Sequence, residues 1–441
     1  MTILTLAFTE GERNEEGRIS GKSGTCSSRG SLMEVQSNRI QRDIEIINSF
    51  NATPEKGITR YTFSEQYLKA RNYVNEELKK IGAYVSTTIA GNVRGRLEGS
   101  EEGRPAVMMG SHIDSVFQGG RFDGVAGVVS AMEVARVIAE KKISHRYPID
   151  VVVFAEEEGA RFGSVMIGSR AWIGQLGFND LQKFRDKDGV SYVEAMERCG
   201  IVPDDPSILK LGAVKTMLEL HIEQSLILES KGLQIGVVEG INGIKQFEVT
   251  INGISNHAGA TPMALRHDAL QGAVRIIAAV EEIAARDMGK NTVATVGFLN
   301  CEPGQANVIP GKVQFTIDIR DLDSNRLDEA AKRAMAVIQR TCGGRGLSFE
   351  TKSRSDTPPV VLSKDIVHLM EEIARKRKIK TLRMPSGALH DSSILSEVTE
   401  VGMIFIPSKD GRSHCPEEYT NLEDIKVGAD ILLDTIIELA T

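Results

Sequence analysis

The 441-residue sequence has few cysteines, a single tryptophan and no long apolar run. The cysteines are dispersed and none forms a CxxC pair, so we expect reduced thiols rather than a disulfide framework; they are Cys26, Cys199, Cys301, Cys342 and Cys415. No segment approaches the roughly 18 consecutive apolar residues of a membrane span, and the first residues lack the basic stretch and cleavage site of a signal peptide. These absences predict a cytoplasmic protein.

The sequence also lacks an excess of basic residues. It has 53 Lys and Arg residues against 60 Asp and Glu residues, which gives a formal net charge of −7. Without a basic field, neither nucleic acid nor an anionic membrane surface is an expected partner. With 41% hydrophobic and 26% charged residues, the composition is that of an ordinary globular protein with a large core.

Short apolar runs alternate with longer stretches of helical periodicity from residue 36 onward. Residues 1–35 show no such periodicity and are rich in Gly, Ser, Arg and Glu, which predicts a disordered tail. The runs Ala106–Met109 and Ile149–Ala155 predict strands. Val125–Lys141, between them, predicts a helix. This alternation is typical of an α/β fold with a mixed or mostly parallel sheet.

The order of predicted elements changes between residues 243 and 355. This segment predicts strand, helix, strand, strand, helix and strand, which is the βαββαβ order of a ferredoxin-like unit. We therefore expect an inserted domain at 243–355 and one α/β domain formed by residues 36–242 and 356–441. The predicted elements of the insertion are Gln246–Ile251, Asp268–Arg286, Thr292–Leu299, Val313–Ile319, Asn325–Arg340 and Leu347–Thr351.

The α/β pattern resumes after the insertion. We predict a helix at Lys364–Arg377 and a strand at Val401–Ile406. A last helix is expected to begin at Leu422, with Thr420 and Glu423 forming a capping box at its start.

Histidine and acidic side chains follow the predicted strands. His112 and Asp114 come after the strand that we expect to end at Met109, and Asp123 precedes a glycine-rich helix start. Open α/β sheets bind ligands at such strand ends. There an imidazole and a carboxylate can share a metal ion, with Asp114 placed to orient the imidazole. A single His-x-Asp is also common in surface loops, so this motif alone predicts no metal site.

Three consecutive carboxylates follow the strand predicted at Ile149–Ala155, namely Glu156, Glu157 and Glu158. Adjacent negative charges at the end of a buried strand repel one another unless cations or a reaction compensate them. We interpret Glu158 as a metal ligand and Glu157 as a general base. A solvated acidic loop is the alternative interpretation.

Two further histidines follow apolar runs. His221 comes after Met217–Leu220, and His414 comes after the strand predicted at Val401–Ile406. Each histidine alone is more often structural than functional. Taken together, three histidines and two acids after strand-like runs supply nitrogen and oxygen ligands suited to Zn²⁺, Mn²⁺, Co²⁺ or Ni²⁺. The five residues are His112, Asp123, Glu158, His221 and His414.

Three other polar side chains are candidates for substrate binding. His257 lies in a loop with Gly and Pro, although an ordinary polar turn has the same composition. Arg320, at a predicted strand end, can hold a carboxylate in bidentate fashion, and a local salt bridge with Asp321 or Asp323 is the structural alternative. Gln224, three residues after His221, is placed either to bind the same substrate or to support the metal loop.

Six motifs make the sequence resemble M20-type amidohydrolases of the N-carbamoyl-L-amino acid hydrolase, β-ureidopropionase and allantoate amidohydrolase branch. They are GSHIDS…GGRFDG, EEEGARF, HIEQ, GISNHAGATPM, SGALHD and GRSHCPEE, and the resemblance covers residues 36–440. His221, the histidine of HIEQ, resembles the residue of the carbamoylase-type members at this position, whereas related di-zinc peptidases have Asp or Glu there. Leu389 in SGALHD is larger than the residue that many relatives have there, so the resemblance does not fix the volume of the pocket.

The resemblance implies a site for two divalent metal ions. Asp123 would bridge the ions, with His112 and His221 on one ion and Glu158 and His414 on the other. Two such cations activate a shared water and stabilise a developing oxyanion.

The resemblance also implies roles for the remaining candidates. Glu157 would take the proton of the bridging water and give it to the leaving nitrogen. Asn307 and Arg320 correspond to the family's substrate ligands. His257 would bind the oxyanion or the carbamoyl oxygen from the second subunit of a homodimer, formed through the inserted domain.

We therefore predict an α/β, mixed-sheet metallohydrolase catalytic domain with an inserted ferredoxin-like (βαββαβ) α+β domain. The expected reaction is hydrolysis of the linear C–N bond of an N-carbamoyl-L-amino acid, a small-molecule ureido acid, to the amino acid, CO₂ and ammonia. Allantoate amidohydrolase or β-ureidopropionase activity is the nearest alternative, followed by an aminoacylase or dipeptidase of the same fold. A non-catalytic binding protein is the alternative from another class, and the intact ligand set with Glu157 argues against it.

Overall fold

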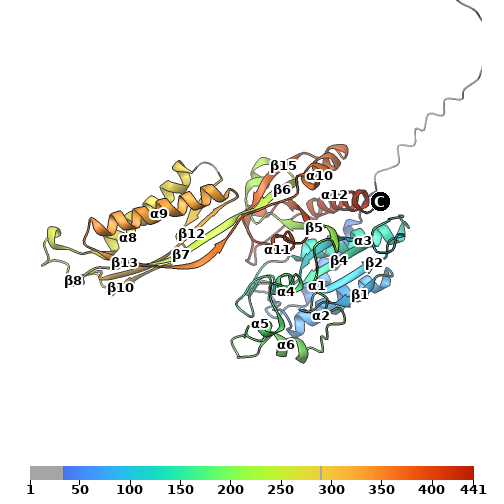
Figure 1. The fold of residues 1–441 in the computed structure, drawn as a ribbon, viewed down its shortest axis with the longest axis horizontal. Coiled ribbons are helices and arrows are strands. Elements are labelled where there is room, and N and C mark those ends of the chain that lie inside the picture. Colours follow the sequence, from blue (N-terminus) through green and yellow to red (C-terminus); the bar gives the residue numbers. More distant parts are fainter. Residues whose placement is uncertain (1–32, 289–290) are drawn as a thin grey trace, which may run out of the picture. The chain divides into compact units, whose positions relative to one another are not determined.

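The computed structural model describes residues 33–288 and 291–441 (Figure 1). Most of the tail predicted at 1–35 lies outside these residues. Residues Glu34–Thr441 form one compact unit, which contains a nine-stranded sheet and a five-stranded sheet.

The nine-stranded sheet is mixed, which confirms the predicted fold class. Its order is β1-β2-β4-β3-β5-β16-β6-β14, and β15 also pairs with β6. The central strands β4, β3, β5 and β16 are all parallel to their neighbours within this group. The strands are β1 (Tyr84–Thr87), β2 (Val93–Leu97), β3 (Ala106–His112), β4 (Ile149–Phe154), β5 (Val214–Ile222), β6 (Ile235–Ile241), β14 (Val360–Val361), β15 (Thr381–Ser386) and β16 (Glu400–Ile406).

Helices cover the nine-stranded sheet, and α3 (Val125–Glu140) is the most deeply buried of the long ones. Because α3 is apolar on nearly all sides, it packs between β3, α1 and α12 rather than facing water. The other long helices are α1 (Ser37–Ser49), α2 (Glu65–Lys80), α10 (Lys364–Lys376) and α12 (Leu422–Ala440). Short helices are α4 (Ile167–Trp172), α5 (Phe178–Leu181), α6 (Tyr192–Arg198), α7 (Ile227–Lys231) and α11 (Asp391–Leu395).

The five-stranded sheet is antiparallel and has the predicted βαββαβ connectivity. Its order is β10-β12-β7-β13, and β9 pairs with β12. Along β12 buried and partly exposed residues alternate, so one face carries the core, against which α8 and α9 pack. The elements are β7 (Gly243–Asn252), α8 (Ala269–Glu282), β9 (Val293–Thr295), β10 (Leu299–Glu302), β12 (Lys312–Asp321), α9 (Ser324–Gly343) and β13 (Ser348–Thr357).

The last helix begins at Leu422 as predicted, but its capping box and two predicted elements of the insertion differ from the structure. The strand predicted at Thr292–Leu299 divides into β9 and β10, with Gly297 in the irregular segment between them, and glycine weakens a strand interior. The helix predicted at Asp268–Arg286 begins after its N-cap Asp268 and becomes a π-helical turn at Ile283–Asp287. The predicted capping box is absent because the N-cap of α12 is Asn421, while the Thr420 hydroxyl donates to the Pro407 carbonyl.

Two strands are longer than predicted, and both extensions reach candidate site residues. β3 continues through His112, which pairs in register with Phe154 of β4. β5 continues through His221, which pairs with Phe405 of β16. Pairing with a parallel neighbour therefore places both histidines inside the ladder rather than beyond the strand ends.

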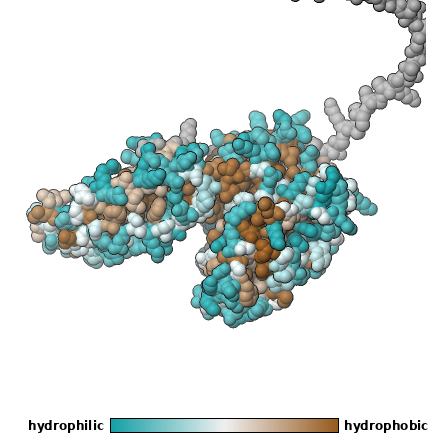
Figure 2. All heavy atoms as spheres, viewed as in Figure 1, coloured by the Kyte–Doolittle hydropathy of each residue, from teal (hydrophilic) through white to brown (hydrophobic). Residues whose placement is uncertain are grey.

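The surface has two features that bear on partners. Among residues 33–288 and 291–441, no helix combines the length and apolarity needed to cross a membrane. Figure 2 shows apolar side chains interspersed with hydrophilic ones on the face of the inserted unit in view. Strongly exposed apolar residues of this unit are Ile254, Met263, Leu265, Val274, Val293, Phe298 and Leu299.

Candidate active site

The candidate site lies where the four central parallel strands end. His112 closes β3, Glu157 and Glu158 follow β4, and His221 lies near the end of β5. His414 comes from the loop after β16. Because the carboxyl ends of adjacent parallel strands meet at one edge of a sheet, residues separated by 300 positions in the sequence become neighbours.

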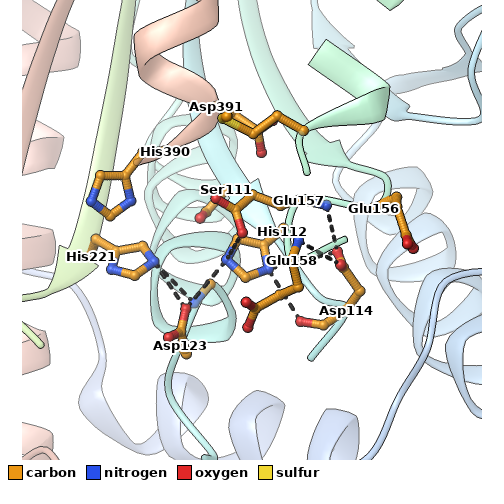
Figure 3. Close-up of polar contacts among 12 residues, drawn as sticks. Ser111, His112, Asp114, Asp123, Glu156, Glu157, Glu158, His221, His390 and Asp391 are labelled. Atoms are coloured by element: carbon orange, nitrogen blue, oxygen red, sulfur yellow. Dashed lines mark hydrogen bonds and ion pairs between the residues drawn. The ribbon is translucent and has the colours of Figure 1, made fainter. Parts of the chain in front are cut away.

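Asp123 is at the centre of this group (Figure 3). Its Oδ1 lies 3.3 Å from Nε2 of His112 and 3.2 Å from Nε2 of His221. Its Oδ2 lies 3.2 Å from Nε2 of His414, which in turn lies 3.4 Å from Oε2 of Glu158. The five predicted ligands therefore converge around one carboxylate.

The two buried histidines both present Nε2 to Asp123 because their Nδ1 atoms face backbone carbonyls. His112 Nδ1 lies 3.2 Å from the Asp114 carbonyl oxygen, and His221 Nδ1 lies 2.9 Å from that of Ile222. A donating Nδ1–H leaves Nε2 with its lone pair directed at the carboxylate. Such a pairing is repulsive for a neutral imidazole unless a proton or a cation lies between nitrogen and oxygen.

The carboxylates after β4 are buried and held by backbone groups. The Asp114 carboxylate accepts the backbone N–H of Glu157 at 3.4 Å and of Glu158 at 3.1 Å (Figure 3). Oε2 of Glu157 lies 3.7 Å from His112 Nε2. Glu156 points away into backbone donors, accepting the N–H of Arg161 and that of Phe162. The predicted triplet therefore splits, with two members at the site and one outside it.

The concentration of charge shifts the titration of these groups. Burial raises the pKa of Glu157 well above its usual range, and repulsion by Glu158 adds to this effect. Burial and the nearby Asp123 carboxylate raise the pKa of Glu158 to about 7. Burial alone would also raise the pKa of Asp123, but hydrogen bonds from the surrounding histidines hold it well below its ordinary value. Burial is thus the main reason why Glu157 and Glu158 bind a proton more tightly than exposed carboxylates do.

The donor set fits two divalent cations. His112, Asp123 and His221 form one group of candidate ligand atoms within 4.8 Å of one another, and Asp123, Glu158 and His414 form a second. Nitrogen and carboxylate oxygen donors of this kind suit divalent transition metals. Two cations would compensate the repelling carboxylates and use the Nε2 lone pairs.

The candidate site opens into a cavity of about 400 Å³ that also holds two predicted substrate ligands. Gln224 lines it and donates from Nε2 to Asp123 Oδ2 at 2.8 Å. Arg320 lines it from the inserted unit, with Nη1 donating to the Gly387 carbonyl at 2.8 Å. Leu389, the departure noted in the sequence, is part of the wall.

The salt bridge predicted between Arg320 and Asp321 or Asp323 is wrong. Arg320 pairs with Asp318, two residues before it on the same face of β12, at 2.9 Å from Nε to Oδ1. Asp321 instead pairs with Arg326 of α9, and Asp323 caps that helix. Residues i and i+2 of a strand share a face, which explains the choice of Asp318.

His257 and Asn307 are not brought to the cavity of their own chain. His257 lies in the short strand β8 (Asn256–His257), which pairs with β11 (Val308–Ile309) at the end of the inserted unit (Figure 1). The side chain is exposed, and its Nδ1 accepts the backbone N–H of Gly259 and Ala260. Asn307 is adjacent, with its carbonyl oxygen accepting the Ala258 N–H.

Sequence reasoning missed several buried residues at the site, among them His390 and Glu418. His390 packs its ring edge-on against His221, 4.6 Å between ring centroids, and lies 2.9 Å from the Ser386 hydroxyl (Figure 3). Glu418 accepts the backbone N–H groups of Phe122 and Asp123. Both lie in quoted motifs, SGALHD and GRSHCPEE, but a short motif does not say which of its polar residues turn inward.

Comparison with known proteins confirms the resemblance that the motifs indicate. A family model described as Peptidase family M20/M25/M40 matches residues 108–438. The N-carbamoyl-L-amino acid amidohydrolase of Geobacillus stearothermophilus is 38% identical over 408 residues, covering 92% of this chain and 99% of that protein. The allantoate amidohydrolase of Escherichia coli (strain K12) is 35% identical over 401 residues, with 91% and 97% covered.

A plant relative and a solved structure extend the comparison. The ureidoglycolate hydrolase of Oryza sativa subsp. japonica is 34% identical over 418 residues, covering 93% of this chain and 86% of that protein. The crystal structure of an amidase of the hydantoinase/carbamoylase family from Burkholderia multivorans aligns with a TM-score of 0.89 at 33% identity, over 92% of this chain and 98% of that one. With most of its length matched at these identities, the chain belongs to peptidase family M20/M25/M40.

Proposed function

We propose that this chain hydrolyses the linear C–N bond of the ureido group in N-carbamoyl-L-amino acids, releasing the amino acid, CO₂ and ammonia. The observation that carries the proposal is the convergence of three histidines on Asp123, next to Glu157 and in one cavity with Arg320. This arrangement combines a metal-type donor set, a base and a guanidinium for the substrate's carboxylate. Relatives at 37% and 38% identity are named N-carbamoyl-L-amino-acid amidohydrolases, which supports this substrate class.

The five donors would hold two divalent cations, Zn²⁺ or Mn²⁺, with Co²⁺ or Ni²⁺ equally suited to this donor set. When bound, such cations lower the pKa of a water molecule and polarise the ureido carbonyl. Asp123 is shared by the two donor groups. Gln224 and the Ser413 hydroxyl help to hold its position, because each donates a hydrogen bond to Oδ2, at 2.8 and 2.9 Å respectively.

Glu157 is the proposed general base and acid. It belongs to neither of the two groups that share Asp123, and its carboxylate is buried beside His112 at the cavity wall. Burial raises its pKa, which strengthens its affinity for the proton of an attacking water. The same carboxyl then gives that proton to the departing nitrogen.

Asp114 is the proposed positioning residue. Its carboxylate accepts the backbone N–H groups of Glu157 and Glu158, and its carbonyl oxygen faces Nδ1 of His112. Asp114 therefore orients both the proposed base, Glu157, and the imidazole of a proposed metal ligand, His112. It lies outside the cavity wall and acts through these groups.

Arg320 and Gln224 are the proposed substrate contacts on this chain. Arg320 presents a guanidinium that is about one-third exposed at the border between the sheet and the inserted unit. A substrate carboxylate bound there would either replace Asp318 as the partner of the guanidinium or share the guanidinium with it. This contact would position the ureido carbon of the substrate next to the Asp123 cluster.

We further propose that the inserted unit mediates a homodimer in which His257 and Asn307 serve the partner's cavity. They are polar, adjacent and remote from the cavity of their own chain. The same unit exposes Met263 and Leu265 at 76% and 69%, next to the His257 loop, and such surfaces are common at interfaces. A second copy would cover these side chains and supply the missing polar groups.

Other ureido acids are the nearest alternatives. Relatives named allantoate amidohydrolase and ureidoglycolate hydrolase are almost as similar as the N-carbamoyl amidohydrolases. β-Ureidopropionate and the amide bonds cut by aminoacylases or dipeptidases use the same type of water attack. Each alternative changes the group held near Arg320 rather than the Asp123 cluster.

Ammonia release from a panel of candidate substrates tests the proposed function. We expect the enzyme, stripped of metal and reloaded with Mn²⁺, Zn²⁺, Co²⁺ or Ni²⁺, to release ammonia fastest from N-carbamoyl-L-amino acids. The comparison substrates are allantoate, ureidoglycolate and β-ureidopropionate, with a dipeptide assayed for amino acid release. A higher kcat/KM for any of these compounds with every metal would contradict the proposal.

Glu157 and Glu158 should respond differently to the same substitution. Glu157→Gln removes the proton acceptor but keeps the shape, so kcat should fall by about 10²-fold or more with metal content unchanged. Glu158→Gln should instead lose metal, measured by elemental analysis of the purified protein. Glu156→Gln is the matched control: it is buried outside the cavity with a pKa raised by burial to about 8, so activity should stay near wild type. Equal metal loss in the first two variants would reverse the assignment.

Arg320→Lys should separate a substrate contact from a structural salt bridge. Lysine keeps the charge but loses the planar fork, so KM for N-carbamoyl-L-amino acids should rise by about tenfold or more with metal content unchanged. Arg326→Lys, which alters the Asp321 pair away from the cavity, is the control and should leave KM unchanged. If Arg320→Lys lowers only the melting temperature, its role is to pair with Asp318.

Mixed subunits test whether His257 acts across a dimer. We expect light scattering to give a dimer and His257→Ala to be nearly inactive. Mixing His257→Ala with Glu157→Gln subunits should restore about a quarter of wild-type activity, because half the dimers are mixed and each has one complete site. Absence of recovery despite demonstrated subunit exchange, or a fully active monomer, would show that His257 does not act in trans.

A further inference from the structure

Arg320 belongs to a row of polar side chains on the open face of the five-stranded sheet. Asp318 lies two residues before it on β12, and Gln246 lies opposite Asp318 in the ladder between β7 and β12. Side chains at these positions share one face of the sheet. It is the face without helices, because the alternate residues of β12, such as Ile317 and Ile319, belong to the core that α8 and α9 cover.

Asp318 occupies one edge of the Arg320 guanidinium. Nε donates to Oδ1 at 2.9 Å, and Nη2 donates to Oδ2 at 3.1 Å. Gln246 donates from Nε2 to the same Oδ2 at 3.2 Å, which holds the carboxylate in place. Arg320 lines the cavity of the candidate active site, and neither Asp318 nor Gln246 is part of its lining. The guanidinium thus reaches the cavity, whereas the two residues that hold it do not.

The guanidinium keeps donors for a further acceptor. Of its five N–H groups, two donate to Asp318 and one, on Nη1, donates to the Gly387 carbonyl at 2.8 Å. One N–H of Nη1 and one of Nη2 have no partner among residues 33–288 and 291–441. A carboxylate is able to accept from these nitrogens while Asp318 keeps the edge formed by Nε and Nη2.

We propose that Asp318, held by Gln246, is the positioning residue for Arg320 and keeps its place when the substrate binds. This step rests on the proposed function, in which the carboxylate of the ureido acid binds Arg320. An unpaired arginine side chain samples many rotamers, and fixing one of them beforehand reduces the entropy lost on binding. Asp318 also sets the plane of the guanidinium, which decides where the carboxylate and the ureido carbon lie.

Positioning and competition predict opposite effects of Asp318→Ala. If Asp318 positions Arg320, kcat/KM for N-carbamoyl-L-methionine should fall by about tenfold or more, because the ureido carbon is no longer placed correctly. If Asp318 instead competes with the substrate carboxylate for the guanidinium, its removal should raise this kcat/KM. Loss of a negative charge also favours an anionic substrate, so a decrease is not a charge effect. An unchanged or higher kcat/KM would overturn the proposal.

A neutral analogue separates positioning from general damage to the fold. N-carbamoyl-L-methioninamide has no carboxylate for Arg320 to bind, so we expect the ratio of kcat/KM for the acid to that for the amide to fall in Asp318→Ala. Gln246→Ala changes no charge and should lower the same ratio by about 2- to 10-fold, the range for one hydrogen bond. It also provides the test if Asp318→Ala does not fold. An equal loss for both substrates would show that Asp318 only stabilises the sheet, which would overturn the proposal.

Glu248 and Gln314 supply matched controls on the same face of the sheet. Gln314 donates to Glu248 Oε1 at 2.9 Å across the same two strands, and Arg354 pairs with the other oxygen. The Glu248 side chain is 17% exposed against 19% for Asp318, and neither control residue lines the cavity of the candidate active site. Glu248→Ala and Gln314→Ala should therefore leave the acid-to-amide ratio unchanged. A decrease as large as that in Asp318→Ala would overturn the assignment.

A binding measurement separates this inference from the proposed function. L-Methionine and L-methioninamide are titrated calorimetrically into the metal-loaded wild type, Asp318→Ala and Glu248→Ala. Tighter binding of the acid than of the amide to wild type and Glu248→Ala, with the difference lost in Asp318→Ala, supports the inference. It does so even if no N-carbamoyl compound is hydrolysed, a result that would refute only the proposed function. A difference that persists in Asp318→Ala, or equal binding of both ligands to wild type, overturns the inference whatever the enzyme hydrolyses.

Discussion

The structure depends on one electrostatic arrangement, the Asp123 carboxylate enclosed by the Nε2 atoms of three histidines. His112 and His221 approach one oxygen and His414 approaches the other, all within 3.2 to 3.3 Å. Nearby acids add negative charge that burial makes costly. The site is thus unstable as a set of bare carboxylates and neutral imidazoles, and this is what makes it suited to divalent cations.

Much of the surrounding structure serves to hold that arrangement. Four parallel strands deliver the ligands to one edge of the sheet. Glu418 fixes the backbone at Asp123, and Asp114 fixes the backbone of the two glutamates. Gly124 shows how tight the packing is: its φ is +65°, and a Cβ there would lie 2.6 Å from the His112 ring. Backbone hydrogen bonds and close packing, rather than flexible side chains, therefore set the donor positions.

The inserted unit carries two kinds of proposed substrate contact, one at the cavity of its own chain and one far from it. Arg320 lies on β12 and lines the cavity of the candidate active site. His257 and Asn307 lie together at the end of the same unit, away from that cavity. Under the proposed function, the inserted unit would offer a carboxylate-binding group to its own chain from β12 and polar groups to a second copy from the separate β8–β11 pair.

The sequence by itself determined the α/β class, the βαββαβ insertion and the family. The periodicity of strands and helices can be recognised within short segments, and the six motifs can be recognised in order along the chain. It also indicated which histidines and acids follow strands. Only the tertiary structure decided which of them meet, since His112 and His414 reach the same carboxylate, Asp123, only through the pairing of β3, β5 and β16. The same holds for the Asp318 partner of Arg320 and for the inward turn of His390. Packing across non-adjacent segments fixes these features, and no local pattern in the chain encodes that packing.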